Sequence, residues 1–131
     1  MTTDLTMLVW SALLCLLMPV VYLVGRSGVP GGLPWGFGNR EAPLAGVPPW
    51  TGRAERAHAN LVENLPPFAI LVLVAAIAGK ANATTALGAT LFFWGRLAHA
   101  VVYVAGVVYL RTAVFFVATV GELMILFQLL R

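Results

Sequence analysis

One stretch of this sequence, RAERAHANLVENLPPF, carries four polar side chains beside a long apolar run. They are Arg53, Arg56, Asn60 and Glu63. Their successive spacings of three, four and three residues place all of them on one side of an α-helix. Guanidinium groups bind carboxylates through paired hydrogen bonds, so this stripe predicts a site for an anionic ligand.

A second polar group lies in the stretch GRLAHAVVYVAGVVYLRT. Arg96, His99 and Tyr103 are spaced three and four residues apart and therefore also share one side of a helix. A structural alternative needs no ligand: Glu63 neutralises an arginine, and Glu122 pairs with Arg96 or with a neighbouring protomer. The arginines near the first stripe outnumber the acids, however, and this excess favours an anion site.

Composition places these helices in a membrane. The chain has 131 residues, of which 60% are hydrophobic and 10% charged, and its mean hydropathy is +0.90. A soluble domain of this length cannot bury so much apolar surface. The net charge of +3 comes from few residues and no basic stripe with interleaved aromatics is present, so nucleic-acid binding is not expected. The two histidines lie far apart and Cys15 is the only cysteine, so no metal site is expected.

Four segments are long and apolar enough to cross a bilayer, which takes about 20 residues. We expect these spans, within a single transmembrane domain, at about residues 5–25, 56–79, 84–110 and 112–130. Only Arg111 separates the third span from the fourth, so a tight turn is expected there. Ionisable groups inside such spans cost at least ~2.5 kcal/mol each, so the polar stripes must face protein partners or water.

The connections indicate how the chain is oriented. The loop at residues 26–55 is dense in glycine and proline and contains Trp35, which is typical of a loop at the membrane interface. This loop and its flanks carry four arginines and the third connection carries Arg111, against Lys80 and Arg131 on the other side. The first and third loops are therefore expected in the cytoplasm, with both termini outside.

The two polar stretches together resemble the MAPEG family, the membrane-associated proteins of eicosanoid and glutathione metabolism, and above all its small bacterial members. The resemblance covers nearly the whole chain. It implies an all-α membrane protein, a four-helix bundle that assembles as a homotrimer in a bacterial inner membrane. It also implies that glutathione is the thiol co-substrate and binds between protomers near the cytoplasmic side.

The resemblance further implies which residues bind glutathione. The expected ligand-binding residues are Arg53, Arg56, Asn60, Glu63, His99 and Tyr103. Arg56, Asn60 and Glu63 would hold the charged ends of the tripeptide, and the third span would supply the last two. Ala59 stands where some eukaryotic members have an arginine, and Arg53 or Arg40 is the expected replacement for that contact.

Two residues are expected to carry the chemistry. Arg111 matches the arginine that stabilises the glutathione thiolate, and Thr112 stands where some members have a serine that reaches the thiol. A guanidinium beside a thiol favours the thiolate, which is the nucleophile. Phe115 replaces a tyrosine found in several active members, and one contact is lost with it.

The resemblance implies a glutathione-dependent transferase or peroxidase that attacks lipophilic electrophiles arriving from the lipid. The alternative is a non-catalytic scaffold, or an accessory subunit of a larger membrane complex, in which the polar cluster serves assembly. A proton or ion path is a third hypothesis. It is disfavoured because the charges gather at one side of the membrane and only Glu122 lies deep in a span.

Overall fold

Four long helices and one short helix make up the structure. The computed structural model describes the whole chain, residues 1–131, and contains no strand. The helices are α1 (Thr3–Ser27), α2 (Gly32–Phe37), α3 (Pro49–Ile77), α4 (Ala83–Ala105) and α5 (Val108–Leu130). All except α2 are long and apolar enough to cross a membrane. The chain is therefore an all-α integral membrane protein with a four-helix transmembrane bundle, as the sequence predicted.

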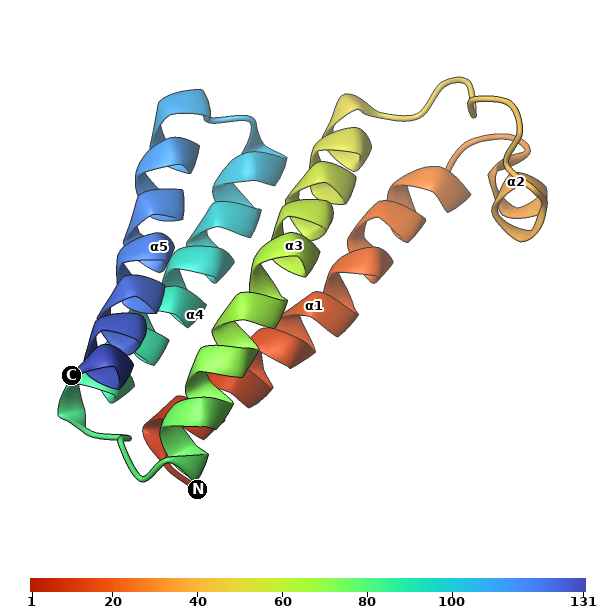
Figure 1. The fold of residues 1–131 in the computed structure, drawn as a ribbon. Helices are drawn as coiled ribbons and strands as arrows, with labels where there is room; N and C mark the ends of the chain where they lie inside the picture. Colours follow the sequence, from red (N-terminus) through yellow and green to blue (C-terminus); the bar gives the residue numbers. More distant parts are fainter.

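The long helices alternate in direction, so the connections fall at two ends of the bundle (Figure 1). The first loop, with α2, and the α4–α5 connection lie at one end, and both termini lie at the other. Helix α4 packs against α1, α3 and α5, whereas α5 packs mainly on α4. Residues of α3, α4 and α5 that lie near the α4–α5 connection are thus close together in space.

Packing within the bundle relies on aromatic stacking and on small residues. The rings of Phe68 and Phe92 stack with their centroids 3.8 Å apart, at the centre of the larger apolar core. Helices α4 and α5 approach so closely that a Cβ atom at Gly88 would lie 2.6 Å from the carbonyl oxygen of Gly121. Small residues are what allow membrane helices to approach in this way. The close contact fixes how α5 is placed against α4.

The connection between α4 and α5 differs from the prediction. It lies at Gly106 and Val107 and not at Arg111. Gly106 adopts a φ of 83°, in the left-handed region, and its N–H bonds to the carbonyl groups of Val102 and Tyr103, which ends α4. Hydropathy could not locate this break because the residues after the glycine are again apolar. Arg111 therefore belongs to the first turn of α5.

Helix α3 also begins earlier than the span predicted for it. It starts at Pro49, rather than near residue 56, with the proline in the first turn. Proline suits this position because the first N–H groups of a helix have no partner within the helix. The extra turns bring Arg53 into the helix, where it continues the polar stripe.

Candidate functional site

Asn60 of α3 and Arg96 of α4 form a buried link between the two polar groups of the sequence. Arg96 Nη1 donates a hydrogen bond of 2.8 Å to Asn60 Oδ1, and Arg96 is only 1% exposed. The guanidinium also lies against the rings of Phe92 and Phe115, with Cζ 5.2 and 4.8 Å from their centroids. An arginine has donors only, so Asn60 must turn its oxygen toward it. The amide nitrogen of Asn60, a donor, has no partner in the chain.

A cavity of about 340 Å³ lies beside this link, between α3, α4 and α5. The residues that line it are Asn60, His99, Tyr103, Arg111, Thr112, Phe115 and Phe116. Five of the eight residues proposed from the sequence therefore share one cavity, although they come from three helices. Phe116 was missed, since nothing distinguishes one apolar residue of a membrane helix from its neighbours.

Arg111 supplies the positive charge of the cavity. It lies in the first turn of α5, and its Cζ atom is 4.4 Å from the centroid of the Tyr103 ring. The Tyr103 ring in turn meets the buried ring of His99 edge-on, with centroids 5.4 Å apart. The Arg111 guanidinium has no ion pair and no side-chain hydrogen bond in the chain, and no acidic residue lines the cavity. An anion that entered would meet a cation with free donors.

Glu122 does not pair with Arg96 within the chain. No nitrogen of Arg96 lies within 4.0 Å of a Glu122 oxygen, because the guanidinium is directed to Asn60. One carboxylate oxygen of Glu122 and two guanidinium nitrogens of Arg96 are buried without a partner. The ion pair expected between them is therefore absent, and pairing of Glu122 with a neighbouring protomer stays a prediction.

Arg53 has a different position from the one expected for a ligand-binding residue. Its Nε donates a hydrogen bond of 2.9 Å to the carbonyl oxygen of Val104, in the last turn of α4. The guanidinium also lies beside Gly106. The last carbonyl groups of a helix lack partners and attract a cation. Arg53 thus ties α3 to the turn that precedes Arg111, and it does not line the cavity.

Arg56 and Glu63 lie outside the cavity, on the exposed side of α3. At about 100° per residue, they stand about 40° and 60° to one side of Asn60, while Arg53 lies on the other side. Neither forms an ion pair within the chain, whose one ion pair joins Arg26 and Glu55. The predicted stripe therefore straddles the boundary between the packed and the exposed faces of α3.

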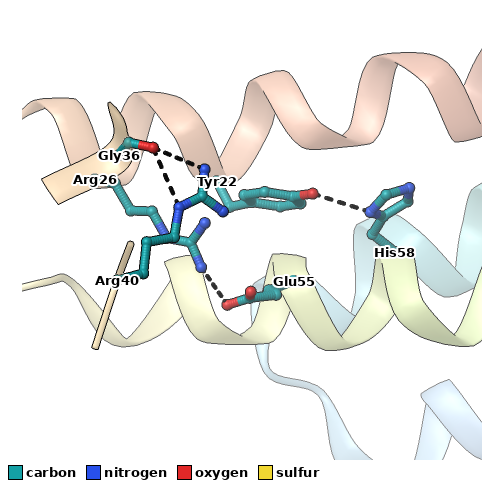
Figure 2. A network of polar contacts seen from close by, with 6 residues as sticks. All are labelled: Tyr22, Arg26, Gly36, Arg40, Glu55 and His58. Atoms are coloured by element: carbon teal, nitrogen blue, oxygen red, sulfur yellow. Dashed lines mark hydrogen bonds and ion pairs between the residues drawn. The ribbon is translucent and has the colours of Figure 1, made fainter. Parts of the chain in front are cut away.

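His58 makes side-chain contacts with α1 and none with the cavity. The contact of its Nδ1 with the Tyr22 hydroxyl oxygen is drawn in Figure 2 and spans 3.1 Å. Its Nε2 lies 3.7 Å from Cys15 Sγ, so both ring nitrogens have a partner on α1. Cys15 is half-buried in the same contact. These bonds hold α1 against α3, on the side of α3 away from the cavity. No group of histidine, cysteine and acidic side chains is arranged to bind a metal ion.

Comparison with known proteins identifies a family for this chain. No curated protein and no solved structure matches the chain significantly. The model of the MAPEG family matches residues 6–131, which includes all of α3, α4 and α5, nearly all of α1 and every residue of the cavity. Because the match extends over almost the entire sequence, the chain belongs to the MAPEG family.

Proposed function

We propose that this protein is a glutathione-dependent transferase or peroxidase that acts on lipophilic electrophiles. MAPEG members commonly use glutathione, which supports this choice of thiol. The observation that carries the proposal is the Arg111 guanidinium, which lies over Tyr103 in a cavity with no acidic side chain and has no counter-ion in the chain. Such an unpaired cation near the membrane interface fits a site that awaits an anionic partner.

The chemistry assigned to Arg111 is the stabilisation of the glutathione thiolate. A free thiol has a pKa near 8.5, and an adjacent guanidinium lowers that pKa, so more of the nucleophile is present at neutral pH. The Thr112 hydroxyl lines the same cavity and can donate a second hydrogen bond to the sulfur. The thiolate then attacks the electrophile, with loss of a leaving group, or reduces a hydroperoxide with a second glutathione to give the disulfide, an alcohol and water.

Binding of the peptide part draws on the remaining polar groups. The unpartnered amide nitrogen of Asn60 is placed to donate to a carboxylate or carbonyl oxygen. Arg56 and Glu63 provide one group for a carboxylate and one for the ammonium of glutathione. Because both lie exposed on α3, next to the face that carries Asn60, they reach the ligand from the rim of the cavity.

We propose a homotrimer because the exposed side of α3 carries Arg56 and Glu63, and these charged side chains must be shielded from lipid. Charged groups within a membrane helix do not face lipid tails without a large free-energy cost. A second copy that packs on this side would enclose Arg56 and Glu63, complete the wall of the cavity and offer a partner for Glu122. Mass measurement of the purified protein in detergent tests the assembly. A stable monomer or tetramer would contradict it.

The proposed orientation places the cavity at the cytoplasmic side of a bacterial inner membrane. The first loop and the α4–α5 connection lie at the same end of the bundle as the cavity, and the arginine-rich loop belongs in the cytoplasm. Glutathione would then enter from the cytoplasm, and apolar substrates would enter from the bilayer.

A titration with glutathione tests the function. Purified protein in detergent is titrated with glutathione while the ultraviolet absorbance of the thiolate is followed, and binding heat is measured in parallel. The proposal predicts saturable binding and a thiolate signal near neutral pH. Binding without thiolate would leave a glutathione-binding protein with no activation of the thiol. Absence of both signals would favour the alternative, a non-catalytic scaffold or accessory subunit, which the structural contacts of Arg53 and His58 also suit.

A further inference from the structure

A second cavity lies outside the bundle, between the end of α1 and α2, and shares no residue with the first. Its volume is about 350 Å³. Its polar lining comes from Arg26, Ser27 and Arg40, and its apolar lining includes Leu23, Leu33 and Phe37. Figure 1 shows α2 beside the end of α1, away from α4 and α5. This cavity has no part in the function proposed above.

Glycine allows α2 to dock against α1. Gly32, the first residue of α2, is buried against the carbonyl oxygen of Arg26, and a Cβ atom there would overlap with that oxygen. Trp35 ties α2 to the loop that follows it, because its Nε1 donates a hydrogen bond of 2.6 Å to the carbonyl oxygen of Ala42. The short helix is thereby fixed against the last turn of α1, and the two helices form the walls of the cavity.

Two guanidinium groups are held at this cavity. Both lie against the Trp35 ring, with Cζ 5.0 Å from the centroid for Arg26 and 5.5 Å for Arg40. Arg40 Nε and Nη2 donate hydrogen bonds of 3.2 and 2.9 Å to the carbonyl oxygen of Gly36, as Figure 2 shows. Arg26 Nη2 forms an ion pair of 2.6 Å with Glu55 Oε2. Contacts within the chain thus hold both guanidinium groups at the cavity.

Donors remain free on both arginines. Nε and Nη1 of Arg26, and Nη1 of Arg40, have no hydrogen-bond partner in the chain. Glu55 approaches from α3 and neutralises only one of the two charges, and the exposed Glu41 does not line the cavity. Both guanidinium groups line the same cavity and leave donors free, so an anion that entered it would be bound favourably.

The apolar side chains at the same cavity identify the kind of anion. Leu23, Leu33 and Phe37 are 54%, 55% and 91% exposed. Arg26 lies in the last turn of a membrane-spanning helix, so the cavity lies where lipid tails meet headgroups. We propose that this cavity binds a phospholipid, with the headgroup phosphate at Arg26 and Arg40 and an acyl chain along the three apolar side chains. A free phosphate would use the arginines alone.

Native mass spectrometry of the detergent-purified protein tests the proposal with three probes. These are dioleoyl phosphatidylglycerol, dioleoylglycerol, which lacks the phosphate, and inorganic phosphate. We expect retention of phosphatidylglycerol, little retention of dioleoylglycerol, and no competition by inorganic phosphate at equal concentration. Equal retention of dioleoylglycerol would overturn the role of the arginines. Competition by phosphate would show that the source of the anion is a free phosphate and would overturn the lipid.

Variants locate the bound lipid. Arg40→Gln should lower phosphatidylglycerol affinity about tenfold, which is the loss of one charge-assisted contact. Arg40 is exposed, hydrogen-bonds only to Gly36 and otherwise lies over the Trp35 ring, so the variant should fold. Phe37→Ser should also weaken lipid binding. The control Arg131→Gln removes a charge at the far end of the bundle and should bind lipid as the parent does. Parental affinity in both Arg40→Gln and Phe37→Ser would place the lipid elsewhere and overturn the proposal.

Discussion

The same three residue types form two clusters at the same end of this bundle. In one, Arg26 lies over the Tyr22 ring at 5.0 Å and that ring meets His58 at 5.8 Å. In the other, an arginine lies over a tyrosine at 4.4 Å and the tyrosine meets a histidine at 5.4 Å. The residues of this second cluster are Arg111, Tyr103 and His99. Composition therefore does not distinguish the two clusters.

Hydrogen bonding does distinguish them. In the α1–α3 cluster, Tyr22 bonds to His58 and Arg26 pairs with Glu55. In the α4–α5 cluster, none of the three side chains has a hydrogen-bond or ion-pair partner within the chain, and all three line a cavity. Polar groups that are already paired stabilise helix packing, whereas unpaired ones at a cavity are available to a ligand. This difference is the basis on which we propose a packing role for the first cluster and a binding role for the second.

The largest expected effect comes from Arg111→Lys. Lysine keeps the charge and much of the reach but lacks the planar fork that can hold the sulfur and a second group together. We expect intact assembly and a loss of conjugating activity and thiolate formation of about 100-fold, the effect of losing one oriented donor in a dry site.

The matched control for this variant is Arg131→Lys. Arg131 also lies over an aromatic ring, that of Phe127 at 5.3 Å, but at the opposite end of the bundle. The Arg131→Lys variant should keep the conjugating activity of the parent protein. Parental activity in Arg111→Lys would mean that the arginine only anchors the helix at the membrane interface, and the comparison between the clusters would fail.

Asn60→Asp tests whether Asn60, at the link between α3 and α4, serves ligand binding as well as stability of the fold. The carboxylate can still accept the hydrogen bond from Arg96, and adds a charge that the guanidinium neutralises, so thermal stability should be retained or raised. The cavity loses the amide donor, however, and gains an acceptor. Glutathione affinity, measured by calorimetry, should fall about 10- to 100-fold.

Asn64→Asp controls for the added charge. Asn64 lies one turn along α3 and bonds to the carbonyl oxygen of Asn60, but it does not line the cavity. The affinity of the Asn64→Asp variant for glutathione should differ little from that of the parent protein. Parental affinity in Asn60→Asp, with the parent protein itself binding glutathione, would show that the amide nitrogen does not meet the ligand.

The two tyrosines test the comparison directly. Tyr22→Phe removes the partner of His58 Nδ1 and should lower the free energy of unfolding by about 1–3 kcal/mol, with glutathione binding unchanged. Tyr103→Phe removes a hydroxyl that has no partner in the chain, so stability should be unchanged and only ligand binding should weaken. Thermal unfolding and calorimetry of both variants check this. Equal destabilisation by the two changes would mean that both clusters serve packing.

Helical periodicity and hydropathy predicted much of this arrangement and missed specific parts of it. The number of spans followed from apolar length. Spacing placed His99 and Tyr103 on one side of α4, and both line the cavity with Asn60, but the binding roles of these residues came from the family resemblance and stay predictions. The position of the α4–α5 turn was wrong because only the backbone conformation of Gly106 marks it. The partner of Arg96 was wrong as well, since periodicity gives the direction of a side chain but not which of several polar groups it meets.

Arg53 illustrates a further limit. Its place on the stripe was predicted from spacing, but its bond to the Val104 carbonyl depends on where α4 ends, which the sequence had placed farther along. The division between the paired and unpaired clusters was likewise beyond sequence, because both contain an arginine, a tyrosine and a histidine. Long-range packing decides which of these groups find partners.

The smallest effect is expected from Phe115→Tyr, which adds a polar group to the unpaired cluster. Phe115 lines the cavity, and its ring lies against the Arg96 guanidinium and near His99. Phe115→Tyr keeps the ring and adds a hydroxyl without removing an existing hydrogen bond. A neutral hydrogen bond contributes about 0.5–1.5 kcal/mol, so glutathione should bind about 2- to 10-fold more tightly if the hydroxyl meets the ligand.

Phe127→Tyr, on the same helix but outside the cavity, should bind as the parent does. Calorimetry of both variants measures the difference. If Phe115→Tyr weakens binding while stability rises, the hydroxyl has bonded to His99 or Arg111 instead, and the unpaired cluster has become a paired one like that around His58.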